Sequence, residues 1–357
     1  MPDDKAGFWS LIIAALTLAA GCGPGSMDSS RASRPLRTRQ AAEEAQGWVP
    51  QDSGTTDLLY AVSFVSPDTG TAVGDNGTIL HTTDGGSTWT AQASGTTEVL
   101  FGVSFVDAQT GTAVGDNGTI LHTADGGGTW TAQASGTTSI LYAVSFVDPY
   151  SGTVVGDNGT ILHTADGGST WTAQPSGTAM QLRGVTFVDA SAGTAVGGDG
   201  WSTTVILRTT DGGATWTPQD PGTPYPARLT SISFADASTG MAVGWAWDFE
   251  GGGPYTVIQR TTDGGSGWMP ADAGYAQSNA QLFGVSVQDA NTATAVGSGY
   301  DVYCGCEYAL IMRTTDGGTS WALQDGGSQG LQGVSFVSAS TGTAVGGDIL
   351  HTITGGR

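Results

Sequence analysis

The chain repeats one short motif six times, and this repetition constrains its fold more than any other feature. The motif is Thr-x-Asp-Gly-Gly-x-x-Trp, and successive copies lie 41 to 53 residues apart. Its aspartates are Asp84, Asp125, Asp166, Asp211, Asp263 and Asp316. Self-similarity at a period of about 40–50 residues is typical of proteins built from similar units that stack or surround an axis. The chain is therefore expected to fold as an array of units.

Each motif ends a longer unit that contains four short segments with the pattern of β-strands. An alternating segment such as Val62-Ser63-Phe64 comes first, then an Ala-Val-Gly segment, then an apolar pair such as Ile79-Leu80, and finally the tryptophan segment. Turn residues separate the four segments, so neighbouring strands are expected to pair antiparallel. The pattern predicts one four-stranded antiparallel blade per unit.

The two ends of the repetitive region settle the number of units. A seventh unit begins at Leu331 and stops at Arg357 without its tryptophan strand, with Thr354 in place of the motif aspartate. An unmatched segment at 47–51 has the sequence of the missing strand. We therefore predict an all-β fold, a seven-bladed β-propeller over residues 47–357. The N-terminal strand completes the last blade and so removes the free sheet edges.

The recurring polar residues are expected to be structural. The motif aspartate can accept hydrogen bonds from turn N–H groups, its two glycines supply positive φ, and the tryptophan packs on the neighbouring blade. One position alternates between two residue types, as His81, His122, His163 and His351 and as Arg208, Arg260 and Arg313. Because these side chains lie on seven separate spokes, we expect a structural hydrogen-bond donor there. No catalytic residue and no metal site are predicted.

Three units differ from the others on one face. In units one to three an Asp-Asn-Gly sequence joins the second and third strands, a signal for a type I′ turn. Units four to six carry longer inserts at 198–204, 245–256 and 298–309, and the connections 220–228 and 270–281 are also longer. In an up-and-down blade all five expansions fall on the same side of the ring, which we call the insert face.

The inserts are rich in aromatic residues that a compact repeat does not require. Clustered exposed aromatics favour a recognition surface. The predicted partner-binding residues are Trp201, Trp245, Trp247, Phe249, Tyr255, Tyr300, Tyr303 and Tyr308, together with Arg183. Arg183 is one of the seven residues expected at the channel mouth, with Tyr60, Phe101, Tyr142, Thr230, Phe283 and Gln332. The alternative is that the inserts pack on one another and only cover the blades.

Cys304 and Cys306 lie inside the third insert, separated by a single glycine. In an oxidising compartment a disulfide is the first interpretation. Free or intermolecular thiols and a metal site are the alternatives, and the metal site would need further ligands, with no histidine nearby in the sequence.

Composition excludes two broad classes of protein. With 38% hydrophobic residues and 11 tryptophans, the chain is not intrinsically disordered. Lys and Arg total 11 against 32 Asp and Glu, a net charge of −21. A surface this negative repels phosphate backbones, so no nucleic-acid partner is expected.

The first 46 residues have the features of an export signal and a linker. Residues 1–22 combine Lys5, an apolar run from Phe8 to Ala20 that is too short to span a bilayer, and small residues up to Cys22. The sequence ending at Cys22 resembles a bacterial lipobox, so we expect lipidation there; an ordinary cleaved signal is the alternative. Residues 23–46 are expected to form a flexible tether. The expected location is the bacterial cell envelope, with a lipid anchor on the outer-membrane or periplasmic side.

The motif strings resemble the Asp-box, or BNR, repeats of bacterial neuraminidases. The whole unit, with His-Thr or Arg-Thr before the aspartate, resembles the Ycf48/HCF136 family of photosystem II assembly factors over residues 47–357. The resemblance implies a propeller that has no catalytic activity and no cofactor, and that chaperones a photosynthetic reaction-centre subunit through a basic patch. The family includes bacterial lipoproteins. This chain departs from that pattern because it is strongly acidic and has no arginine cluster inside the propeller.

Two classes of function follow. The first is a non-enzymatic, monomeric scaffold anchored in the envelope, which docks a protein client such as a membrane-protein subunit on its insert face. The second is a carbohydrate-binding or glycoside-hydrolase propeller with a glycan ligand. A sialidase would need three arginines around a carboxylate, and the insert face offers only Arg183 and Arg228.

Overall fold

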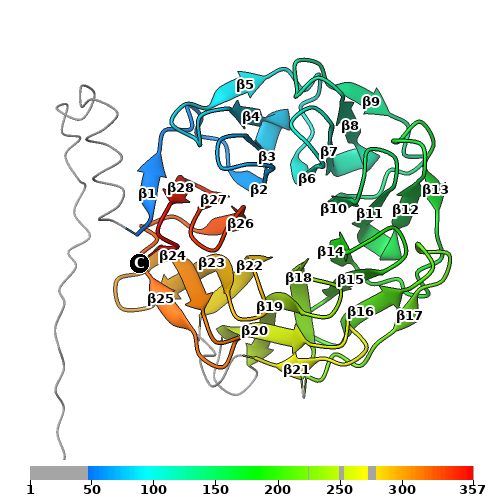
Figure 1. Ribbon diagram of the computed structural model, residues 1–357. Helices are drawn as coiled ribbons and strands as arrows, with labels where there is room; N and C mark the ends of the chain where they lie inside the picture. The colour runs from blue at the N-terminus through cyan, green and yellow to red at the C-terminus, as the bar shows by residue number, and fades with distance from the viewer. Residues whose placement is uncertain (1–46, 224, 249–252, 272–278, 357) are drawn as a thin grey trace, which may run out of the picture. The chain divides into compact units, whose positions relative to one another are not determined.

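The computed structural model describes residues 47–223, 225–248, 253–271 and 279–356. In these residues 28 strands form seven four-stranded antiparallel sheets arranged as blades around a central channel (Figure 1). The predicted seven-bladed propeller is confirmed. The predictions for residues 1–22, for lipidation of Cys22 and for the tether at 23–46 lie outside the described residues. Within the described part, no helix is long and apolar enough to cross a membrane.

The strands follow one another from the channel outward in each blade. Blade 1 contains β2 (Leu59–Phe64), β3 (Gly70–Gly74), β4 (Ile79–Thr82) and β5 (Thr90–Gln92); blade 2 contains β6 (Leu100–Phe105), β7 (Gly111–Gly115), β8 (Ile120–Thr123) and β9 (Thr131–Gln133). Blade 3 contains β10 (Leu141–Phe146), β11 (Gly152–Gly156), β12 (Ile161–Thr164) and β13 (Thr172–Ala173); blade 4 contains β14 (Leu182–Phe187), β15 (Gly193–Gly198), β16 (Thr204–Thr209) and β17 (Thr217–Pro218).

Blades 5 and 6 have the longest strands. Blade 5 contains β18 (Ala227–Phe234), β19 (Gly240–Asp248), β20 (Gly253–Thr261) and β21 (Met269–Pro270); blade 6 contains β22 (Ala280–Val287), β23 (Ala293–Asp301), β24 (Cys306–Thr314) and β25 (Ala322–Gln324). Blade 7 contains β26 (Leu331–Phe336), β27 (Gly342–Gly346), β28 (Ile349–Thr352) and, as its outer strand, β1 (Val49–Gln51).

The N-terminal strand closes the ring as predicted. β1 pairs antiparallel with β28, with Val49 opposite His351. Just before β1, the buried Trp48 donates from its indole Nε1 to Oε1 of Gln324 in blade 6, at 2.9 Å. Its ring meets that of Phe336 edge to face, with centroids 5.7 Å apart. The first strand therefore fills the same place in blade 7 that a tryptophan strand fills elsewhere.

The core consists of apolar layers between successive blades. One such layer joins Val73 and Ile79 of blade 1 to Leu100, Ala113 and Leu121 of blade 2, all fully or nearly fully buried. The second strand of each blade is buried on both faces, because each blade lies between two others. This explains the continuous apolar character of the Ala-Val-Gly segments.

Glycine at both ends of these segments is required by close packing. A Cβ added to Gly70 would lie 2.5 Å from the Phe64 ring, and one added to Gly74 would lie 2.2 Å from the carbonyl oxygen of Leu58. No side chain fits at such distances, so the Gly-Thr-Ala-Val-Gly sequence is set by the approach of the inner strand.

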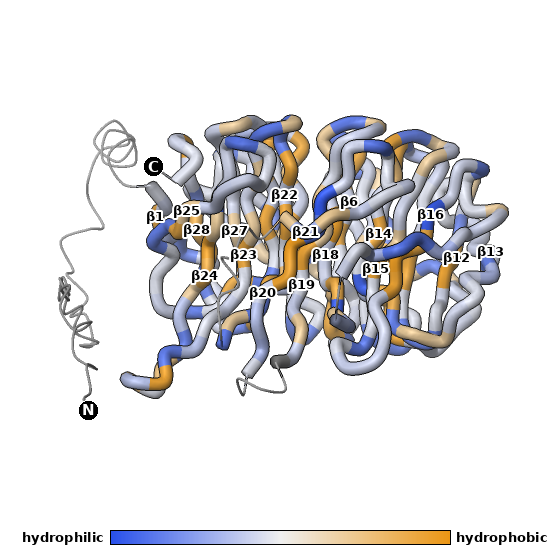
Figure 2. The backbone as a smooth tube through the Cα atoms, turned by 90° about the horizontal axis from the view of Figure 1, so that it is seen from below, coloured by the Kyte–Doolittle hydropathy of each residue, from blue (hydrophilic) through white to orange (hydrophobic). Residues whose placement is uncertain are grey.

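The two sides of the ring differ in relief. The hairpins β19–β20 and β23–β24 extend beyond the other blades and project from the lower edge in Figure 2. In blades 1 to 3 the same position is a tight turn, where Asn76 (φ 55°) and Gly77 (φ 69°) both adopt the left-handed conformation that a type I′ turn requires. The fold thus places all the described inserts on one face.

Candidate functional site

The inserts of blades 4 and 5 are built on rigid turns and ladders. β19 and β20 stay paired as far as Asp248 and Gly253. In the loop between β15 and β16, the Asp199 carboxylate accepts hydrogen bonds from the backbone N–H groups of Trp201, Ser202 and Thr203 at 2.8–3.0 Å. Burial opposes ionisation of Asp199, but these bonds and one from the Ser202 hydroxyl outweigh it and hold its pKa well below the usual range.

Three of the predicted partner-binding residues are exposed on the insert face, and a fourth, the partly exposed Trp247, stacks on one of them. The rings of Trp201 and Trp247 stack with centroids 5.2 Å apart and planes 27° from parallel, although they come from different blades. Trp201 is 51% exposed. On the β23–β24 hairpin, Tyr300 is 48% and Tyr303 98% exposed. The structure therefore presents two aromatic groups, one over blades 4 and 5 and one over blade 6.

Three other predicted residues lie beneath this surface. Trp245 is 8% exposed, with the Arg228 guanidinium 5.5 Å from its ring centroid. Tyr255 and Tyr308 are half-buried and pack on the apolar clusters of blades 5 and 6. These three side chains support the inserts from below. For them, the alternative prediction, in which the inserts cover the blades, describes the structure better than partner binding does. Phe249 lies outside the described residues.

The seven residues expected at the channel mouth line one cavity. This cavity has a volume of about 250 Å³, and its wall includes residues of all seven inner strands, among them Tyr60, Phe101, Tyr142, Arg183, Thr230, Phe283 and Gln332. Tyr60, Phe101 and Tyr142 form a continuous row of rings, with centroid distances of 5.0 and 5.5 Å. The mouth is thus aromatic on the side of blades 1 to 3.

Arg183 ends this row and is fixed by a residue that sequence reasoning missed. Its guanidinium carbon lies 4.2 Å from the centroid of the Tyr142 ring. Oε1 of Gln181 accepts hydrogen bonds from Nε and Nη2 of Arg183, at 3.1 and 2.9 Å, and from Nη2 of Arg228 at 2.7 Å. One amide therefore holds two arginines from neighbouring blades at the mouth.

Cys304 and Cys306 are joined by a disulfide at the tip of the β23–β24 hairpin. Cys304 is exposed, and Gly305 between the two cysteines has a φ of +68°. The bridge therefore tightens the end of the hairpin. The described residues contain no group of three or more His, Cys, Asp or Glu side chains that could hold a metal ion.

The Asp boxes lie on the opposite face and act within their own turns. In blade 1 the Asp84 carboxylate accepts hydrogen bonds from the Thr82 hydroxyl (2.9 Å) and from the backbone N–H (2.9 Å) and hydroxyl (2.7 Å) of Thr88. Equivalent contacts surround the other five aspartates, which are Asp125, Asp166, Asp211, Asp263 and Asp316. The hydrogen bonds that these carboxylates accept come from their own turns.

The alternating His/Arg position is also used for internal contacts. Nδ1 of His81 lies 3.0 Å from the hydroxyl oxygen of Thr71, and the other three histidines make the same contact. Arg208 and Arg313 instead reach the next blade, where Nε of Arg208 donates to the Gly264 carbonyl and Nη2 of Arg313 to that of Ala339. These contacts leave no shared site at the position.

At five of the seven junctions between blades, a glutamine three residues after the tryptophan links one blade to the next, a role that the sequence did not reveal. Oε1 of Gln133 in blade 2 accepts the Trp171 indole N–H at 3.1 Å, and its Nε2 donates to the Gly167 carbonyl at 3.0 Å, both in blade 3. Gln51, Gln92, Gln174 and Gln324 make the same pair of contacts. The recurrence of Gln at this position was the available signal.

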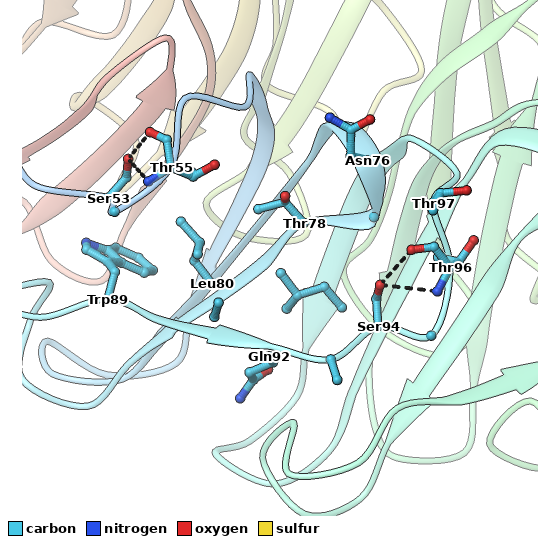
Figure 3. Close-up of a pocket in the computed structure, with 16 residues that line it drawn as sticks. Ser53, Thr55, Asn76, Thr78, Leu80, Trp89, Gln92, Ser94, Thr96 and Thr97 are labelled. Atoms are coloured by element: carbon cyan, nitrogen blue, oxygen red, sulfur yellow. Dashed lines mark hydrogen bonds between the residues drawn. The ribbon is translucent and has the colours of Figure 1, made fainter.

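A hollow on the flank of blade 1 has no lining that suggests chemistry. It has a volume of about 920 Å³ and is drawn in Figure 3. Its hydroxyls are engaged in local turns, where Ser53 donates to the Thr55 carbonyl and Ser94 to that of Thr96. None of its lining residues carries a titratable side chain.

Comparisons with known proteins agree with this geometry. A family model described as "Photosynthesis system II assembly factor YCF48" matches residues 40–132 and 129–217. No curated protein matches the chain. The solved structure of YCF48 bound to a D1 peptide has a TM-score of 0.64 and 20% identity, covering 87% of this chain and 95% of the other. YCF48 from Cyanidioschyzon merolae gives a TM-score of 0.65 and 20% identity, with coverages of 86% and 98%.

An enzyme shares the same fold. The GH74 xyloglucanase from Xanthomonas campestris gives a TM-score of 0.65 at 14% identity, covering 87% of this chain. The match covers 54% of the enzyme, so this chain corresponds to about half its length. At identities this low, the structural likenesses show the propeller fold alone.

Proposed function

The chain belongs to the family of the photosynthesis system II assembly factor YCF48, and from this premise we propose that it is a non-enzymatic scaffold that binds a protein client on its insert face. The observation that carries the proposal is the aromatic surface over blades 4 to 6, which includes the stacked Trp201–Trp247 pair over blades 4 and 5. A YCF48 of known structure binds a D1 peptide. Protein binding is therefore a property found within the family.

The stacked pair is suited to binding because it is held in place before a partner arrives. Asp199 fixes the loop that carries Trp201, and the β19–β20 ladder carries Trp247. Large aromatic side chains contribute most to protein interfaces when little conformational entropy is lost on binding. The pair thus supplies apolar contact area at low entropic cost.

A non-enzymatic function agrees with the chemistry of two insert carboxylates, Asp199 and Asp301. Glycoside hydrolysis uses two carboxyl groups across the scissile bond, and one of them must act as an acid. The pKa of Asp199 is held low by its turn, so it is a poor acid. The Asp301 carboxylate accepts the backbone N–H of Tyr303 at 2.8 Å in the hairpin turn. Both carboxylates stabilise loops.

The test of client binding compares surface variants in native membranes. Trp201→Ala combined with Trp247→Ala removes the stacked pair, while Tyr150→Ala removes an aromatic residue that is 67% exposed on the opposite face. After photocrosslinking and affinity capture, we expect one protein to be captured by the wild type and by the Tyr150 variant, and to be lost from the Trp variant. Capture of the same proteins by all three forms would reject the insert face as the docking site.

A glycan is the second candidate ligand, and the exposed Trp pair is the feature that favours it, since aromatic faces also bind sugar rings. Affinity electrophoresis of the wild type in gels containing xyloglucan or other soluble polysaccharides tests it directly. Retardation that is lost in the Trp variant, with no client captured, would replace the protein-binding proposal with glycan binding.

We further propose that the protein is exported and anchored in the cell envelope through lipid on Cys22. The support is the signal-like sequence of residues 1–22. Metabolic labelling with an alkyne fatty acid should label the wild type and not Cys22→Ser, and the variant should leave the membrane fraction. Equal labelling of both forms would contradict the anchor.

A further inference from the structure

The first three blades place an aromatic residue and a carboxylate side by side at the channel mouth. Each inner strand presents a ring, and the tight turn of the same blade begins with an aspartate. We call these six residues the mouth crescent: Tyr60, Phe101, Tyr142, Asp75, Asp116 and Asp157. These turns join the second and third strands, which is the position of the inserts in blades 4 to 6, so the crescent lies on the insert face.

The carboxylates of the crescent differ in how they are satisfied. The Tyr142 hydroxyl donates to Asp157 at 3.0 Å. Burial and the neighbouring Asp75 carboxylate raise the pKa of Tyr60 to about 12, so this hydroxyl also keeps its proton beside an aspartate. The middle blade has Phe101 in place of tyrosine, and no hydrogen bond from a described residue reaches the Asp116 carboxylate. The carboxylate at the centre of the crescent therefore has no hydrogen-bond donor among the described residues.

Like charges crowd this centre. Burial, and then the carboxylates of Glu98 and Asp157, raise the pKa of Asp116. A carboxylate among other carboxylates is stabilised by a cation more than by any neutral donor. The geometry therefore favours a positively charged group next to Asp116.

The chain itself shows how a cation lies in this row. The Arg183 guanidinium lies over the Tyr142 ring at 4.2 Å and takes up the last aromatic position of the crescent. The rings of Tyr60 and Phe101 have no such partner among the described arginines. Arg208, Arg260 and Arg313 bind carbonyls of the Asp-box side, and Arg228 lies over Trp245. Arginine stacked on an aromatic ring beside a carboxylate is a stable arrangement.

We propose that the mouth crescent binds an arginine or lysine side chain of the protein client, with the cation over Tyr60 and Phe101 and against Asp116. The inference rests on the proposed function, because it defines the chemistry of the same client. A basic segment lying across the mouth would contact the crescent on one side and the aromatic inserts on the other. The net charge of −21 favours its approach.

Labelled peptides test the charge preference with the full chain in nonionic detergent. The probe is a short Gly/Ser peptide containing three arginines, and its matched control carries citrulline, a neutral isostere, at the same three positions. We expect the arginine peptide to bind at least about tenfold more tightly than the citrulline peptide in fluorescence anisotropy at physiological salt. Equal affinity for the two peptides would overturn the proposal.

Two variants locate the binding to the crescent. Asp116→Asn removes the central carboxylate and leaves the turn intact, because only backbone atoms of Asp116 bond within it. Phe101→Leu removes the ring and keeps an apolar side chain of similar size. Each variant should lower the affinity for the arginine peptide about tenfold and leave that for citrulline unchanged. Two variants are used so that, if one of them does not fold, the other still tests the proposal.

The control for overall charge is Asp68→Asn, which removes one exposed carboxylate on the opposite face. If it weakens binding as much as Asp116→Asn, attraction to the acidic surface explains the affinity and the crescent is rejected. Client capture that needs Trp201 and Trp247 but is unaffected by Asp116→Asn would likewise reject the crescent while leaving the proposed function intact.

Discussion

Single aspartates stabilise the Asp-box turns. Asp84→Ala removes three hydrogen bonds at 2.7–2.9 Å, and because the carboxylate is largely exposed we expect the free energy of unfolding to fall by about 1 kcal/mol. Urea unfolding measures the change. Asp68→Ala is the matched control. Asp68 contacts the same turn only through its backbone carbonyl oxygen, which accepts the Gly85 N–H, so this substitution removes the same charge and keeps the contact. An equal loss in both variants would assign the effect to charge and not to the turn.

The four histidines make stability depend on pH. Burial lowers the pKa of His81, His122, His163 and His351, so below about pH 6.5 the unfolded chain binds more protons than the folded chain. We therefore expect the melting temperature to be constant above about pH 7 and to fall as the pH drops through 6.5.

The Asp boxes add a second loss at lower pH. Hydrogen bonds lower the pKa of these carboxyls, so their contribution is complete above the unfolded value and is lost only as the pH falls below about 4. Replacing all four histidines with glutamine should remove the first loss and keep the second. A melting temperature that is the same at pH 7.5 and 5.5 in the wild type would contradict the role given to the histidines.

Between elements, glutamine side chains link adjacent blades at five of the seven junctions. Gln133→Ala leaves the Trp171 indole N–H and the Gly167 carbonyl without partners, so we expect the free energy of unfolding to fall by about 2 kcal/mol. Gln219→Ala is the control, because the Gln219 amide donates only to Thr217 within its own blade. A comparable loss in both variants, measured by urea unfolding, would show that the link between blades contributes nothing.

The elements could be predicted from the sequence where the contacts are local and repeated. The Asp-Asn-Gly turns, the strand order and the box turns depend on residues a few positions apart, so the repeat reveals them. The glutamine links join residues at least 31 positions apart in different units, and an outer-strand glutamine has the pattern of an exposed residue. Trp245 was expected on the surface but is buried, because sequence alone does not show that the β19–β20 ladder continues past it.

At the scale of the whole molecule, stability is expected to depend on closure of the ring by β1. The experiment compares a chain that starts at residue 47 with one that starts at residue 53. The shorter chain lacks β1, so the edge of β28 is exposed, and it lacks Trp48, which is 9% exposed and contacts blades 6 and 7. Loss of a buried tryptophan alone costs about 3–5 kcal/mol, so we expect a large fall in melting temperature. A melting temperature close to that of the longer chain would mean that the ring is stable with six complete blades and a three-stranded seventh blade.

A circular permutation separates the contribution of the strand from that of the closure between the two termini. Moving residues 47–52 to follow Arg357 places Trp48 three residues after Gly356, which is the spacing between the second glycine and the tryptophan in the other boxes. All four strands of blade 7 are then consecutive, and the chain ends on the outer strand as blades 1 to 6 do. If β1 acts only by completing the blade, the permuted chain should melt within a few degrees of the original. A permuted chain as unstable as the truncated one would show instead that joining the first and last residues of the chain in one sheet is itself what holds the ring.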